Sequence, residues 1–124
     1  MRNLSGTWQG LYSYPIASDP VPFTTQLRHA EEWLTGTTAE AAAVNSTMTA
    51  TVTGRVSGHH VTFLKVYDRQ SDQYDAVHYE GEVDLEGQEI WGRWTVPGNW
   101  SGTFLMIRAS QPQAALSERW AERV

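Results

Sequence analysis

Apolar and polar residues alternate with a period of two along most of this chain, and short turn segments interrupt the alternation. Such a period places successive side chains on opposite faces of a β-strand, so each run predicts a strand with one buried face. Glu86-Gly87 and Pro97-Gly98 are typical of the separating turns. The predicted strands span residues 4–14, 23–30, 33–38, 47–56, 59–68, 74–85, 88–96 and 99–109.

About eight strands joined mostly by short loops favour a meander, in which each strand pairs with the next. We therefore predict an all-β fold: an antiparallel up-and-down barrel of about eight strands with a short C-terminal helix. Closure removes exposed strand edges and leaves room for side chains or one small ligand. A two-sheet sandwich is the alternative. Residues 1–109 form the predicted barrel, and the Ala-rich residues 39–46 fit a loop or a helical turn.

Residues 110–124 are predicted to form a C-terminal helix or tail. Ser110 and Pro112 are residue types that begin helices. Three apolar residues then recur at every fourth position, as on one face of a helix: Leu116, Trp120 and Val124. This stripe needs a partner, either the open end of the barrel or another subunit, so a homodimer is one expectation. A partly frayed tail is the alternative.

Charge and residue types restrict the partners and the location of the protein. The formal net charge is −5 and no basic run occurs, which argues against nucleic acid and anionic membranes as partners. The chain has no cysteine, which excludes disulfides and thiolate metal sites. It shows no membrane span and no apolar leader segment, so we expect a cytoplasmic protein.

The sequence carries no signature of catalysis or of a cofactor. It lacks a nucleophile elbow, a phosphate loop and a dinucleotide turn. His59 and His60 are adjacent in a predicted strand, so their rings point to opposite faces and do not favour a shared metal. Glu80, Glu82 and Asp84 share one strand face, as a solvated outer wall would. We therefore expect neither a metal nor a cofactor.

The opening strand and the last strand carry a resemblance to a known class. Residues 5–10, Ser-Gly-Thr-Trp-Gln-Gly, resemble the Gly-x-Trp strand of the calycin barrels, which are lipocalins, fatty-acid-binding proteins and the avidin/streptavidin group. In the first two groups an arginine from the last strand packs over that tryptophan at the closed end. Trp8 and Arg108 match this pair. The resemblance implies a calycin-like barrel, closest to uncharacterised bacterial members.

Two ligands of related barrels are not expected. Biotin sites of the avidin class use several tryptophans, and residues 62–64, Thr-Phe-Leu, lack the one such a site would need. The opening strand, followed by Tyr14-Pro15, also resembles nitrobindin-type haem barrels. Those need a proximal histidine near the end of the barrel, and residues 102–109 contain none.

Strand parity predicts which side chains face the interior. The inward set is Trp8, Tyr12, Tyr14, Val61, Phe63, Lys65, Tyr67, Tyr79, Gly81, Val83, Ile90, Gly92, Trp94, Val96, Trp100, Phe104, Met106 and Arg108. A mostly apolar lining with a few polar groups is typical of a ligand pocket. The candidate ligand-binding residues are Lys65, Tyr67, Tyr79, Trp94, Trp100, Tyr12, Phe63 and His29.

Lys65, the only lysine, is the most informative of these residues. Between Phe63 and Tyr67 on one strand face, it could meet an anionic head group. Desolvation could also make it a base or a Schiff-base former. Alternatively it lies near a strand end and its ammonium reaches water.

Three hypotheses about function follow. The preferred one is a non-enzymatic barrel that binds a small apolar or amphipathic molecule in its interior. The second is a small barrel enzyme of the isomerase or cyclase type, and the third is a protein-interaction module that acts as a homodimer. A fold of this class does not by itself choose among them.

Overall fold

A computed structural model of the protein describes residues 3–15, 19–41, 46–68, 76–98 and 100–123. These residues form eight strands and one helix: β1 (Gly6–Tyr12), β2 (Val21–Ala30), β3 (Trp33–Ala41), β4 (Thr47–Ser57), β5 (His60–Tyr67), β6 (Ala76–Val83), β7 (Glu89–Val96), β8 (Trp100–Arg108) and α1 (Gln113–Arg123). The all-β class with a short C-terminal helix is confirmed.

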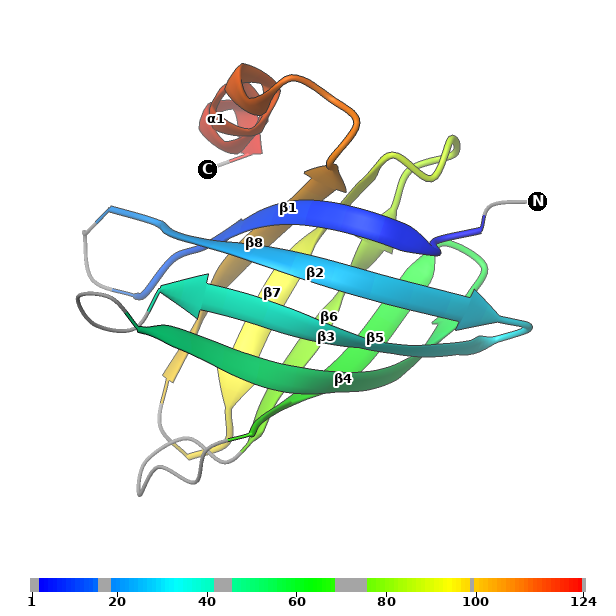
Figure 1. The fold of residues 1–124 in the computed structure, drawn as a ribbon, viewed down its shortest axis with the longest axis horizontal. Helices are drawn as coiled ribbons and strands as arrows, with labels where there is room; N and C mark the ends of the chain where they lie inside the picture. The colour runs from blue at the N-terminus through cyan, green and yellow to red at the C-terminus, as the bar shows by residue number, and fades with distance from the viewer. Residues whose placement is uncertain (1–2, 16–18, 42–45, 69–75, 99, 124) are drawn as a thin grey trace.

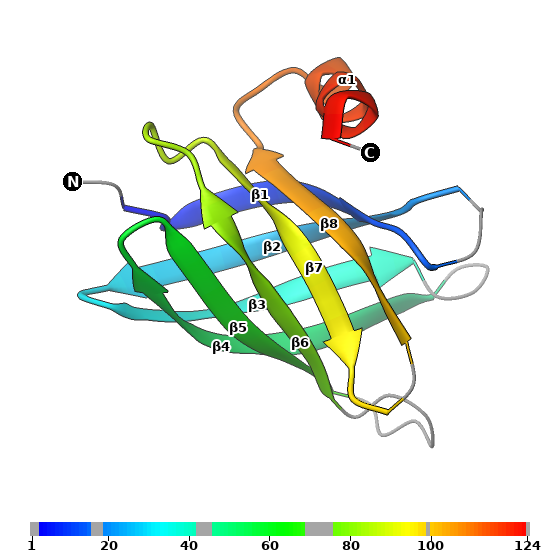
Figure 2. The same cartoon turned by 180° about the vertical axis from the view of Figure 1, so that it is seen from behind.

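Every strand pairs antiparallel with the next, and β8 pairs back with β1 to close a barrel (Figures 1 and 2). In the closing register Trp8 lies opposite Arg108 and Tyr12 lies opposite Phe104. The up-and-down barrel is therefore confirmed, and the alternative of a two-sheet sandwich is wrong. Closure leaves the sheet without a free edge, so all eight strands present one face to a common interior.

The strand bounds agree with the sequence prediction to within a few residues, except near residue 40. Residues 39–41, expected to begin a loop or a helical turn, instead continue β3, because Ala39 and Glu40 pair with Thr49 and Met48 of β4. This extension places Glu40 on the inward parity of the strand. The expectations for residues 16–18, 42–45, 69–75, 99 and 124 lie outside the described residues.

Alternating burial along the strands confirms the predicted parity. In β6, Val77 and Tyr79 are buried, whereas the neighbouring Glu80 is exposed. Two inward positions where β6 and β7 meet admit glycine only. A Cβ atom on Gly81 would lie 2.1 Å from the carbonyl oxygen of Trp91, and Gly92 is equally crowded by the backbone of the facing strand. These glycines let the strands approach closely in the barrel wall.

The predicted plug closes one end of the barrel. The Arg108 guanidinium lies 4.4 Å from the centroid of the fully buried Trp8 indole. Arg108 donates hydrogen bonds to three backbone carbonyls, those of Asn3, Ser5 and Gly87, the last at 2.9 Å. The indole N–H of Trp8 donates to the carbonyl of Leu4. One cation thus joins the N-terminal segment and the β6–β7 turn to the barrel wall.

Helix α1 lies outside the barrel against β1 and β8 (Figure 2). Its buried residue Leu116 packs on Leu105 and Ile107, which point outward from β8. The expectation that the open end or a second subunit covers the stripe is wrong for Leu116, because β8 carries apolar residues on both of its faces. Among the described residues, no helix is long and apolar enough to cross a membrane.

The plug predicts a specific loss of stability. We expect Arg108→Met to lower the free energy of unfolding by about 2 kcal/mol, since it removes the stacked cation and leaves three carbonyls without their donor. Arg93→Met is the matched control, because Arg93 is exposed on β7 and donates only to the Ser101 hydroxyl among the hydrogen bonds of the described residues. Urea unfolding measures both. Equal losses would contradict the proposed role of Arg108.

Candidate functional site

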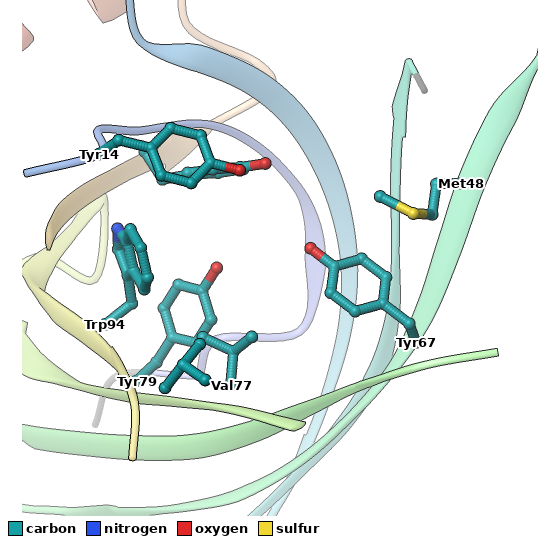
Figure 3. Close-up of a pocket in the computed structure, with 8 residues that line it drawn as sticks. Tyr14, Met48, Tyr67, Val77, Tyr79 and Trp94 are labelled. Carbon is teal, nitrogen blue, oxygen red and sulfur yellow. The ribbon is translucent and has the colours of Figure 1, made fainter. Parts of the chain in front are cut away.

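A cavity that is partly open to solvent lies at the end of the barrel opposite the plug, where β1, β5 and β7 end and β4 and β6 begin. Its volume is about 130 Å³. The lining residues, most of which Figure 3 labels, are Tyr12, Tyr14, Met48, Tyr67, Val77, Tyr79, Trp94 and Val96. Four of the eight are tyrosines, so the lining joins apolar ring faces to hydroxyl groups.

The cavity volume limits what can enter. Pockets for drug-sized molecules measure roughly 300–1,000 Å³, whereas an apolar cavity of about 150 Å³ holds a benzene molecule. The cavity of about 130 Å³ therefore has the size of one small ring. Its walls are held by edge-to-face contacts of Trp94 with Tyr14 and Tyr12, whose centroids lie 5.7 and 6.1 Å from that of Trp94.

A buried ion pair lies behind the tyrosines. Lys65 Nζ is 3.0 Å from Glu40 Oε1, and the two side chains are 2% and 3% exposed. Tyr12 donates its hydroxyl proton to Glu40 Oε2 at 2.7 Å, and Tyr67 donates to Oε1 at 3.1 Å. The Glu40 carboxylate thus accepts three donors, which is the hydrogen bonding that a buried charge requires.

Aromatic rings surround the ammonium of the pair. Lys65 Nζ lies 4.7 Å from the ring centroid of Tyr67 and between 5.2 and 5.7 Å from those of Tyr12, Phe23 and Tyr79. The ammonium also donates to the Tyr79 hydroxyl oxygen at 3.4 Å. Ring faces attract a cation most strongly where water is excluded, so this cage adds to the stabilisation from Glu40.

Burial moves the pKa values of this cluster in two directions. It lowers the pKa of Lys65, and the adjacent Glu40 opposes that shift. It raises the pKa of Tyr12, Tyr67 and Tyr79, and the negative charge of Glu40 raises all three further. The tyrosines therefore remain neutral hydroxyl groups well into the alkaline range.

The structure brings five of the predicted site residues together. Tyr12, Tyr67, Tyr79 and Trp94 line the cavity. Lys65 lies directly behind three of them, and with 1% exposure it contradicts the expectation that its ammonium reaches water. That expectation was wrong because Lys65 lies two residues inside the strand end, where Glu40 supplies the partner that water would otherwise provide.

The other three predicted residues lie elsewhere. Phe63 is one layer deeper in the core, stacked on Tyr79 with centroids 4.6 Å apart. Trp100 is at the rim of the barrel, 39% exposed, with its ring 6.0 Å from that of Tyr14. His29 is at the plugged end, where its Nδ1 accepts the Leu4 N–H at 3.0 Å.

Sequence reasoning missed Glu40, the residue that organises the cluster. The signal was present: Leu34, Gly36, Thr38 and Glu40 alternate, which continues the inward parity of β3 through the region interpreted as a loop or helical turn. A lysine predicted to face the interior also requires a carboxylate nearby. Tyr14 was predicted to face inward but was not selected, because parity alone does not say which end of the barrel is open.

Comparison of the chain with models of protein families, with curated protein sequences and with solved structures finds no match. The protein is thus defined by its own geometry, as a closed antiparallel barrel of eight strands with an aromatic cavity at one end. The barrel is consistent with a calycin-like fold.

The buried pair predicts a large difference between two chemically identical substitutions. We expect Glu40→Gln to destabilise the protein by about 3–5 kcal/mol, because Lys65 is left buried without its counter-charge. Glu32→Gln, which breaks the exposed ion pair with Arg55, should cost less than about 1 kcal/mol. Denaturant unfolding of both variants is the measurement. Similar small losses would show that the pair is not buried as described.

The double variant Glu40→Gln/Lys65→Met supplies a second measurement on the same pair. It should lose less stability than the sum of the two single variants, because removing both charges leaves no unpaired ion in the interior. Additive losses would indicate that the two side chains do not interact.

The buried tyrosines predict the alkaline limit of stability. Because the pKa values of Tyr12, Tyr67 and Tyr79 are raised in the folded protein, their stabilising contribution is complete below about pH 10 and is lost as pH rises further. Lys65, whose pKa is lowered in the folded protein, contributes in the opposite direction until the unfolded chain has also lost that proton, which is complete about one pH unit above the ordinary lysine pKa of 10.5.

Tyrosinate absorbance, recorded alongside near-ultraviolet circular dichroism, tests this. At least three of the five tyrosines should keep the spectrum of a neutral phenol until the barrel unfolds. Ionisation of all five in the folded protein would contradict the described burial.

Proposed function

We propose that the protein is a calycin-like barrel that binds a small apolar or amphipathic molecule in its aromatic cavity. The observation that carries this proposal is the cavity of about 130 Å³, whose lining joins the indole of Trp94 and apolar side chains to four tyrosine rings. Such a combination of apolar walls and a few oriented polar groups is the usual composition of a small-molecule site.

The rigidity of the walls supports binding. Trp94 is fixed at both ends, because its ring packs edge-to-face on Tyr12 and its indole N–H donates to the carbonyl of Ser13 at 2.8 Å. Tyr79 is held between Phe63 and Phe104, with centroids 4.6 and 4.9 Å away. A cavity with fixed walls requires little ordering when a ligand enters, which favours affinity.

The two alternatives have less support. For an enzyme of the isomerase or cyclase type the natural base is Lys65, which lies behind the cavity lining and is bonded to Glu40. For a homodimer, the motivating helical stripe packs through Leu116 on the protein's own wall. Size-exclusion chromatography with light scattering measures the oligomeric state directly.

A cavity-filling variant tests the proposed function. Fluorobenzene, a single-ring probe, should bind the wild type and quench the fluorescence of Trp94 on the cavity wall. Val77→Phe should abolish this binding, because Val77 lines the cavity. Val66→Phe is the matched control, since Val66 points outward from the neighbouring strand and is 39% exposed. Fluorine NMR of the probe reports binding to each protein.

The wild type and Val66→Phe should bind alike. Absence of binding to the wild type, or equal binding to Val77→Phe, would overturn the proposed function. Native mass spectrometry of the freshly purified protein would reveal any small molecule that accompanies it.

A further inference from the structure

The tyrosine hydroxyl groups of the cavity differ in whether they already donate a hydrogen bond to the protein. In Figure 3 the hydroxyl oxygens of Tyr14, Tyr67 and Tyr79 point toward the space that the rings enclose. Tyr67 and Tyr12 donate hydrogen bonds to the Glu40 carboxylate. These two hydroxyls are therefore occupied by the ion pair behind the wall.

The hydroxyl groups of Tyr79 and Tyr14 are available to donate a hydrogen bond to a ligand. The oxygen of Tyr79 accepts from Lys65, which directs the Tyr79 proton away from the ammonium. No residue in the described part of the chain accepts a hydrogen bond from either Tyr79 or Tyr14. Tyr79 is buried, where a hydroxyl donor without an acceptor is unfavourable, and the half-buried Tyr14 directs its hydroxyl into the same space, so both groups suit a ligand atom that accepts a hydrogen bond.

The charges of the site are already balanced. Lys65 and Glu40 neutralise each other at 3.0 Å, and three donors occupy the Glu40 carboxylate. Among the residues that the structure describes, an anionic ligand beside Glu40 would find no free cation to pair with. A cationic ligand would meet the Lys65 ammonium, and three of the about four acceptor positions of the Glu40 carboxylate are already occupied. Burying either charge without a counter-ion is costly, so the geometry selects against both.

We propose, building on the proposed function, that the cavity binds an uncharged compound of one small ring that carries a hydrogen-bond-accepting oxygen or nitrogen. The ring of the ligand fills the apolar space beside Trp94 and Val77. Its acceptor atom accepts hydrogen bonds from the hydroxyl groups of Tyr79 and Tyr14. Small cyclic ketones and phenols belong to this class. The sequence suggested that Lys65 could pair with the anionic head group of a ligand. In the structure Lys65 pairs with the protein's own Glu40 instead.

The first experiment compares probes of similar size by isothermal calorimetry or fluorescence titration. Cyclohexanone has a neutral acceptor, cyclohexanecarboxylate is an anion, and cyclohexylammonium is a cation. We expect cyclohexanone to bind at least about a hundredfold more tightly than either charged probe. Comparable affinity for one of the charged probes would overturn this inference and leave the proposed function intact, provided that fluorobenzene binds.

The second experiment removes single donors. Tyr79→Phe should weaken cyclohexanone binding by about tenfold, the effect of one neutral hydrogen bond, and Tyr14→Phe should act in the same direction. Binding of fluorobenzene, which makes no comparable hydrogen bond, should change less than about threefold and shows that each variant retains the cavity. If cyclohexanone affinity is unchanged in both variants, the inference is wrong. If fluorobenzene fails to bind the wild type, the proposed function fails as well.

Discussion

Closure of the sheet by the pairing of β1 with β8 is the constraint on which the rest of the structure depends. It turns the inner faces of eight strands toward one small space, where a charged or polar group without a partner is costly. At one end Trp8 and Arg108 fill that space. At the other end the tyrosines and Trp94 leave a cavity. The barrel is therefore closed by side chains at one end and has a cavity at the other.

The buried ion pair determines the chemical properties of the cavity wall. Glu40 and Lys65 bring two charges into the interior, and the hydroxyls of Tyr12 and Tyr67 complete the coordination of the carboxylate. The pair satisfies itself, so it presents a neutral, hydrogen-bonded wall to the cavity instead of a free charge. Removing either member leaves an unpaired buried ion, which links the stability of the fold to the chemistry of the site.

Much of the site was predictable, and the missing parts have physical reasons. Parity placed Tyr12, Tyr67, Tyr79 and Trp94 on the inner face, because a one-residue shift would reverse every strand. Parity does not indicate where along the barrel axis a side chain lies. His29, which lies at the plugged end, was thus grouped with residues from which the structure separates it.

The sequence by itself determined the strand pattern and the meander, because these follow from local alternation and short turns. The resemblance to calycin barrels added the expected pairing of Trp8 with Arg108. Only the tertiary structure decided that Glu40 meets Lys65, that helix α1 packs on the outer wall, and that a cavity remains. Those features depend on distances between residues remote in the chain, which strand tilt and closure set and which no local pattern records.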